Sequence, residues 1–205
     1  MFEIEETCLP SLEEHYFDNY TESYEYYKFI DQVYPTIDFR VDFDSCYFEN
    51  VDFSNKNLTG IMFSNCCFKD CDFSNCNLED AGIHKTTFDT CKFLGSNISN
   101  STLKNNIFNI CNMVYVIISD SSLNNIIFNI CDMTNATLFE LKLKNVEYNE
   151  CKLIGASIQG TSLKDIDISS CDIKDIRVDI NNLKGSSINY NQAIGIIENF
   201  DIEIK

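Results

Sequence analysis

Residues 41–80 read VDFDSCYFENVDFSNKNLTGIMFSNCCFKDCDFSNCNLED, and every fifth residue counted from Phe43 is bulky and apolar. The same phase continues without a slip to Ile188, so thirty consecutive steps place Phe, Leu, Ile, Met, Val or Tyr at one position. A period of five matches neither the 3.6-residue period of a helix nor the two-residue period of a strand. The sequence therefore predicts a repeat architecture.

Each five-residue step has an internal pattern around its bulky central residue. The residue two places before the centre is small or β-branched, as at Val41, Cys46 and Val51. Nine of the eleven cysteines occupy this position and alternate there with Val, Ile, Ala, Ser and Thr, so we expect them to be small core residues. Such use of cysteine favours a reducing, cytoplasmic location.

Similar residues also recur every twenty positions, which predicts a coil of four sides with one step on each side. The aromatic residues of one such column are Phe48, Phe68, Phe88, Phe108, Phe128 and Tyr148. The cysteines of a second column are Cys71, Cys91, Cys111, Cys131, Cys151 and Cys171. Identical side chains can stack in this way only if each coil returns to the same face.

The pattern of a small residue, Asp or Asn, Leu or Phe, and two polar residues resembles that of pentapeptide-repeat proteins. It is clear in VDF at 51–53, CDF at 71–73 and CNL at 76–78. The resemblance implies an all-β fold, a right-handed quadrilateral β-helix. Thirty steps would make about 7.5 coils, a rod about 36 Å long at a strand spacing of ~4.8 Å.

Two flanking segments lie outside the regular repeat, which we place at residues 37–188. Residues 1–36 are acidic and rich in Tyr, and Ser11 with Glu14 reads as a capping box. Apolar residues three or four apart then predict a helix from about Leu12 to Val33. Residues 189–205 predict a cap made of a short helix and a final strand.

The C-terminal segment NYNQAIGIIENFDIEIK is similar to the cap of the quinolone-resistance branch of the family. In that branch a helix and a short strand form a two-fold dimer, so the resemblance implies a homodimer. The candidate interface residues are Ala193, Ile196, Ile197, Phe200, Ile202 and Ile204.

Catalytic and metal-binding motifs are not found in the sequence. The two histidines are His15 and His84, and we expect His84 on an outward turn. Only Cys67 among the repeat cysteines should face outward, and cysteines five apart would point from successive sides rather than gather around a metal. We predict no enzymatic activity, no cofactor, no metal and no disulfide.

Three polar residues stand at inward positions of the repeat. Lys56 and Asn181 lie near the two ends, where each could reach past the rod. Asn106 lies deeper, and we expect it to bond to turn backbone.

The formal charge of −17 is unevenly distributed along the chain. Residues 1–40 carry −8, residues 41–188 carry −7 from 19 acids and 12 bases, and residues 189–205 carry −2. No basic stripe is evident, so nucleic acid is a poor partner. No run of 18 apolar residues exists, and the acidic N-terminus does not resemble a secretion signal, so we expect neither a membrane span nor export.

Surface acids are the candidate functional residues. Asp52, Asp72, Asp132 and Asp172 should share one face, and Asp80, Asp120 and Glu140 should share one corner. The alternative is that outward Asp and Asn serve only turns and solubility.

The resemblance implies a DNA mimic that presents an acidic rod to a type II topoisomerase, DNA gyrase, and protects it from quinolones or inhibits it. The rival hypothesis is an interaction module that binds a partner through its acidic, Tyr-rich N-terminal segment and uses the β-helix as a spacer.

Overall fold

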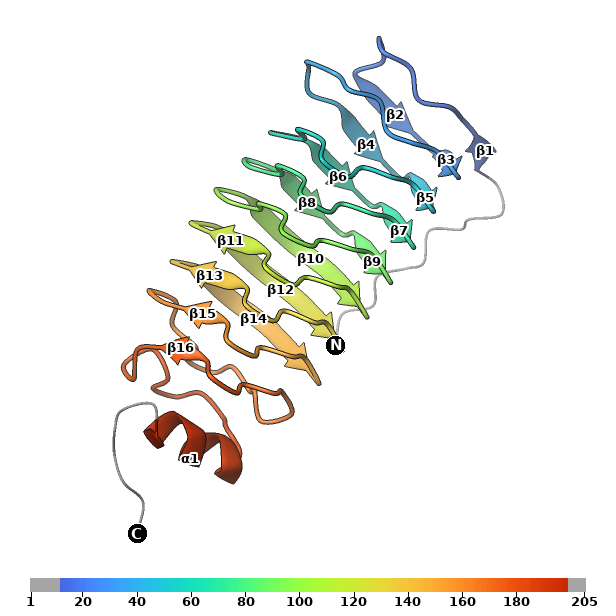
Figure 1. Ribbon diagram of the computed structural model, residues 1–205. Helices are drawn as coiled ribbons and strands as arrows, with labels where there is room; N and C mark the ends of the chain where they lie inside the picture. Colours follow the sequence, from blue (N-terminus) through green and yellow to red (C-terminus); the bar gives the residue numbers. More distant parts are fainter. Residues whose placement is uncertain (1–11, 199–205) are drawn as a thin grey trace.

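The computed structural model describes residues 12–198 and shows a rod of stacked coils with one helix at its C-terminal end (Figure 1). Strands pair in parallel with a register of twenty residues, so that Phe63 pairs with Ile83 and Phe68 with Phe88. The fold is an all-β parallel solenoid of about 8 turns, as the repeat predicts. Each turn therefore crosses four walls before it returns to the first.

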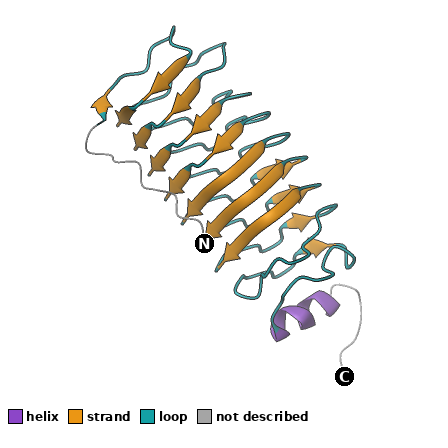
Figure 2. Ribbon diagram, turned by 180° about the vertical axis from the view of Figure 1, so that it is seen from behind, coloured by secondary structure: helices purple, strands orange, loops and turns teal. Residues whose placement is uncertain are grey.

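We number the walls in chain order within a coil. Wall 1 contains residues 41–45, wall 2 residues 46–50, wall 3 residues 51–55 and wall 4 residues 56–60, together with the residues at multiples of twenty further on. Walls 1 and 2 form one sheet of twelve strands, in which the last three strands run across the corner between both walls (Figure 2). The strands of this sheet are β1 (Glu13–Glu14), β2 (Ser23–Glu25), β3 (Tyr27–Ile30), β4 (Asp42–Asp44), β5 (Tyr47–Glu49), β6 (Met62–Ser64), β7 (Cys67–Lys69), β8 (Gly82–His84), β9 (Thr87–Asp89), β10 (Thr102–Asn109), β12 (Ser122–Asn129) and β14 (Lys142–Asn149).

The other two walls have less continuous pairing. Wall 4 forms a four-stranded sheet of β11 (Ile117–Ser119), β13 (Thr137–Phe139), β15 (Ser157–Ile158) and β16 (Arg177–Val178). Wall 3 is held by single parallel bridges that run from Asp52 through Asp72 to Asp172.

The corners between walls explain the polar residues of the repeat. The last residue of nearly every five-residue step has a positive φ; the non-glycine values lie between 49° and 64°. Asn, Asp and Gly tolerate this left-handed region best, and they fill most corners. Ile110 and Ile130, with φ of 52° and 54°, are β-branched exceptions and lie exposed on neighbouring coils.

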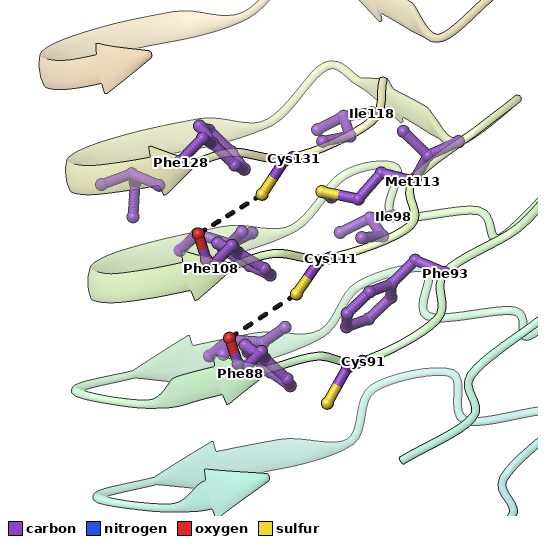
Figure 3. Close-up of a cluster of buried hydrophobic side chains, with 14 of the residues drawn as sticks. Phe88, Cys91, Phe93, Ile98, Phe108, Cys111, Met113, Ile118, Phe128 and Cys131 are labelled. Carbon is purple, nitrogen blue, oxygen red and sulfur yellow. Dashed lines mark hydrogen bonds between the residues drawn. The ribbon is translucent and has the colours of Figure 1, made fainter. Parts of the chain in front are cut away.

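The interior of the rod consists of stacked side chains, as predicted (Figure 3). On wall 2 the rings of Phe88 and Phe108 are 4.8 Å apart between centroids, and those of Phe108 and Phe128 are 5.0 Å apart. The buried cysteines of wall 3 stack beside them, and the Cys131 thiol donates to the Phe108 carbonyl at 3.3 Å. Both predicted columns are therefore confirmed.

Asn106 is the buried polar residue that the sequence singled out. Its amide nitrogen donates to the Ile83 carbonyl at 2.8 Å, and its amide oxygen accepts from the Thr86 N–H at 2.9 Å. This bonding to backbone was predicted. Lys56, in contrast, reaches upstream and donates to the Thr36 hydroxyl at 3.3 Å.

The predicted N-terminal helix from Leu12 to Val33 is wrong, because this segment forms β1, β2 and β3. The tyrosines of the supposed helical face separate: Tyr16 and Tyr20 are 68% and 84% exposed, whereas Tyr24 is buried. Tyr24, Phe29 and Tyr34 are five apart. The rings of Tyr24 and Phe29 stack on Phe43 and Phe48 at 5.2 and 5.1 Å, and the Tyr34 ring lies tilted against that of Phe53 at 5.1 Å. Packing on the aromatic columns outweighs helix propensity.

This segment joins the solenoid with a register of nineteen residues instead of twenty, since Tyr24 pairs with Phe43 and Phe29 with Phe48. The solenoid therefore begins upstream of the expected boundary at residue 37. Phe17 closes the end: its ring lies parallel to that of Phe29 at 4.3 Å.

The C-terminal helix is confirmed as α1 (Tyr190–Glu198). Asn189 and Gln192 cap it reciprocally, because the Asn189 N–H donates to Gln192 Oε1 at 2.7 Å and the Gln192 N–H donates to Asn189 Oδ1 at 3.0 Å. The Gln192 amide also donates to the carbonyls of Ile168 and Cys171 in the last full coil. The helix thereby covers the C-terminal end of the core.

Candidate binding surface

The four walls of the rod differ in net charge, which the total charge of the sequence does not show. Between residues 41 and 188, walls 2, 3 and 4 carry 16 acids and 6 bases, a net charge of −10. Wall 1 carries 3 acids and 6 bases, a net charge of +3. The predicted acidic surface therefore occupies three sides of the rod, and the fourth side is basic.

The acids of wall 3 take part in turn structure. Asp52, Asp72, Asp132 and Asp172 stand in one ladder, where each carboxylate accepts the backbone N–H two residues further on at 2.8–3.2 Å. Lys92 and Lys152 in the same ladder lie 3.3 Å from the carboxylates of Asp72 and Asp132. Here the structure supports the alternative interpretation, turn chemistry, and part of the charge is neutralised.

Partial burial on its own would raise the pKa of Asp72. The hydrogen bonds from Ser74 and the ammonium of Lys92 outweigh that effect, so its pKa lies below the ordinary value. Asp132 has the same arrangement with Thr134 and Lys152, and its pKa is likewise lowered. Both carboxylates are therefore ionised and held in place.

The acids at the corner between walls 4 and 1 are different. Asp80, Asp120 and Glu140 are exposed and stand at left-handed corner positions, with φ of 59°, 52° and 50°. Within residues 12–198 their carboxylates form neither an ion pair nor a side-chain hydrogen bond. This corner row is the part of the predicted surface whose charge is free for a partner.

Sequence reasoning missed the basic character of wall 1, and the expectation that the chain lacks a basic stripe is wrong. The six lysines of this wall, which we call the lysine wall, are Lys85, Lys104, Lys142, Lys144, Lys164 and Lys184. All six are exposed. The signal was present in the sequence, because Lys104, Lys144, Lys164 and Lys184 are separated by twenty or forty residues.

The remaining candidates for chemistry are the histidines and the cysteines. In the described part of the chain, no three His, Cys, Asp or Glu side chains come together as a metal site requires. His84 lies half-buried beside Lys104, and burial followed by the lysine charge lowers its pKa. Burial raises the pKa of the Cys46 thiol to about 11 and that of Cys76 to about 12, so these thiols stay neutral.

The predicted dimer surface is only partly described. Ile196 is 5% exposed and packs on the last coils of its own chain, whereas Ile197 is 38% exposed on the outer side of α1. Ala193 is half-buried. Phe200, Ile202 and Ile204, and the strand expected there, lie outside the described residues.

A rod of stacked coils, in which each coil has four walls of five residues, defines the class of four-sided parallel β-solenoids. The family model described as the pentapeptide repeat region matches residues 41–118 and 82–158, more than half of the chain. The chain belongs to the pentapeptide-repeat family.

Solved structures similar to this chain were also found. QnrB1, a plasmid-mediated fluoroquinolone resistance protein, is 18% identical, over 88% of this chain and 100% of that chain, with a TM-score of 0.43. HetL, a pentapeptide repeat protein involved in heterocyst differentiation regulation from the cyanobacterium Nostoc, is 11% identical, over 82% and 88% of the two chains, with a TM-score of 0.30. No curated protein matches the chain.

No helix in residues 12–198 combines the length and apolar character that crossing a bilayer requires.

Proposed function

We propose that this protein is a non-enzymatic DNA mimic that binds a type II topoisomerase, DNA gyrase, and modulates it or protects it from quinolones or related toxins. The observation that carries the proposal is the segregation of charge, which leaves a net −10 on three walls of a straight rod. A basic groove that holds duplex DNA would also accept an acidic rod of similar length, which carries about half the charge of one DNA turn. The setting proposed is the reducing cytoplasm.

The dimensions support this proposal. About 8 turns at ~4.8 Å each give a solenoid about 38 Å long, close to one turn of duplex DNA at about 34–36 Å. The corner row of Asp80, Asp120 and Glu140 places free carboxylates at multiples of one coil height along this length. Association would be steered electrostatically and weakened by salt.

The test is a gyrase supercoiling assay with and without a quinolone. The proposal expects the protein at micromolar concentration either to restore supercoiling in the presence of the drug or to change it in the absence of the drug. No effect in either arm would refute the proposal. The triple variant D80N/D120N/E140Q should lose most of the effect, whereas K69Q/K92Q/K152Q, which changes the same number of charges, should keep it.

We further propose that α1 pairs two chains, because Ile197 is an exposed apolar residue beside the end of the rod. Ile197→Asp should then give a monomer by light scattering, and Tyr190→Asp, at an exposed position in the first turn of the same helix, is the matched control. An unchanged mass for Ile197→Asp would show that the helix does not join subunits.

A second candidate is the interaction module, favoured by one observation at the N-terminal end. Tyr16, Tyr20 and Tyr26 are exposed there on an acidic segment that packs onto the solenoid. Truncation at residue 36 would uncover the aromatic core, so the sharper experiment is Tyr16→Ser with Tyr20→Ser. If the variant loses partner binding but keeps its effect on gyrase, the interaction module is favoured. If it keeps partner binding but loses its effect on gyrase, the DNA mimic is favoured.

A further inference from the structure

The lysine wall differs from three lysines elsewhere on the rod, each of which forms an ion pair. On walls 2 and 3, Lys69, Lys92 and Lys152 each bind the carboxylate that lies one coil earlier: the first lies 3.0 Å from Glu49 and the other two 3.3 Å from Asp72 and Asp132. In each pair the two residues are twenty apart, so the parallel register places opposite charges side by side. The solenoid thus neutralises these lysines within its own surface.

On wall 1 the corresponding neighbours are not acids. Lys104 of β10 pairs in register with His84 of β8, and Lys144 of β14 pairs with Asn124 of β12. Lys164 and Lys184 occupy the same place on the next two coils, where the Asp165 N–H donates to the Gly185 carbonyl at 3.0 Å. None of these four lysines forms an ion pair within residues 12–198.

Three successive coils therefore present like charges at about one strand spacing, ~4.8 Å between backbones. Like charges directly opposite each other on neighbouring strands destabilise a sheet. From residue 81 onward the wall holds six lysines and one acid, Asp165. The lysines of this wall repel one another, although the chain as a whole has a net charge of −17. A negatively charged ligand bound to the wall would neutralise this repulsion.

We propose that the lysine wall is a binding surface for an acidic, extended polypeptide segment of a partner protein that lies along the rod. The column formed by Lys104, Lys144, Lys164 and Lys184 spans four coil heights, about 19 Å. An extended strand with acids at alternate positions offers carboxylates on one side about 6.8 Å apart. The long, flexible lysine stems can reach carboxylates at that spacing.

Nucleic acid fits this surface less well. The wall contains no Arg after residue 41 for bidentate phosphate contacts, and its outward neighbours Thr102, Ser122 and Ser162 offer no aromatic ring for base stacking. The other three walls, with their net charge of −10, would repel the rest of a long polyanion.

The experiment measures binding of a fluorescein-labelled peptide of eight Glu–Ser repeats by fluorescence anisotropy at about 50 mM salt. Three proteins are compared: the wild type, K104Q/K144Q/K164Q, and the matched control K69Q/K92Q/K152Q. Both variants remove three positive charges, so a difference between them in peptide affinity depends on which wall loses its lysines and not on the total charge. A single-stranded oligonucleotide and a duplex of similar charge serve as competing probes.

The proposal expects salt-sensitive binding by the wild type, at least tenfold weaker binding by the lysine-wall variant, and a change of less than twofold in the control. It also expects the lysine-wall variant to unfold at the same or a higher temperature than the wild type, because like-charge repulsion is relieved, so that lost binding cannot be attributed to misfolding. Absence of peptide binding by the wild type, equal loss in both variants, or tighter binding of either oligonucleotide than of the peptide would overturn it. The corner row of Asp80, Asp120 and Glu140 borders the lysine wall, but K104Q/K144Q/K164Q leaves those carboxylates unchanged, so this variant should retain its effect on gyrase.

Discussion

Phe108 offers the sharpest test of the stacked interior, and the perturbation is Phe108→Ala. The ring is fully buried between Phe88 at 4.8 Å and Phe128 at 5.0 Å. Truncation of a buried Phe to Ala costs about 3–5 kcal/mol because both burial and close packing are lost. For a chain of this size, about 2–4 °C of melting temperature per kcal/mol predicts a decrease of roughly 6–20 °C.

Phe108→Leu separates the stacking from the burial. It keeps most of the apolar volume but loses two ring contacts, each worth about 0.5–1.5 kcal/mol, so we expect a cost of about 1–3 kcal/mol. Urea unfolding followed by circular dichroism measures both variants, and a second probe checks cooperativity, because long repeat arrays can depart from two-state behaviour. A cost below about 1.5 kcal/mol for Phe108→Ala would refute the placement of this ring inside a continuous column.

Two further predictions concern the corners and the thiols. The double substitution Ile110→Asn and Ile130→Asn should leave the urea midpoint unchanged or raise it, because relief of the left-handed backbone, about 1–2 kcal/mol per residue, offsets the lost burial of half-exposed side chains. Ile126→Asn, at a fully buried site, should cost about 3 kcal/mol or more of the free energy of unfolding. Equal losses of stability at the corner sites and at Ile126 would contradict the corner geometry. The free energy of unfolding should be constant at neutral pH and fall above about pH 9, the ordinary thiol pKa, up to the raised pKa values of about 11 for Cys46 and about 12 for Cys76. The reason is that the unfolded chain releases these protons at a lower pH than the folded chain. A flat profile of stability between pH 9 and 12 would show that these thiols are not buried.

The repeat could be predicted from sequence because every wall of every coil must bury one bulky apolar side chain. A bulky residue at every fifth position and similar residues at every twentieth leave only a four-sided coil that can bury them together. Even the role of Asn106 follows, because a buried amide needs backbone partners. This part of the prediction depends on no local propensity.

The first coil was missed because two periods compete there. Tyr16, Tyr20 and Tyr24 have helical spacing, whereas Tyr24, Phe29 and Tyr34 have the spacing of the repeat. One residue fewer between Tyr34 and Phe43 shifts the phase, so a search in fixed register does not extend upstream. Packing of Tyr24, Phe29 and Tyr34 on the ends of the aromatic columns decides between the two patterns, and the position of those columns is known only from the whole solenoid.

The charge pattern was missed for a different reason. Adding charges along the chain gives −7 for residues 41–188 and conceals a wall of opposite sign. Adding them by wall separates +3 from −10. The distinction between wall 3 and the corner row could not be predicted in this way, because it depends on whether each carboxylate already accepts a backbone N–H.

The central claim is that one rod carries two neighbouring binding surfaces, the lysine wall and the corner row of Asp80, Asp120 and Glu140, and that we propose the corner row as the surface that binds gyrase. The most direct measurement is the dissociation constant for gyrase of D80N/D120N/E140Q beside that of K104Q/K144Q/K164Q. Three exposed charge contacts at about 0.2–1 kcal/mol each predict that the acid variant binds roughly tenfold more weakly, whereas the lysine variant binds as well as or better than the wild type. Equal affinities for the two variants would contradict the account.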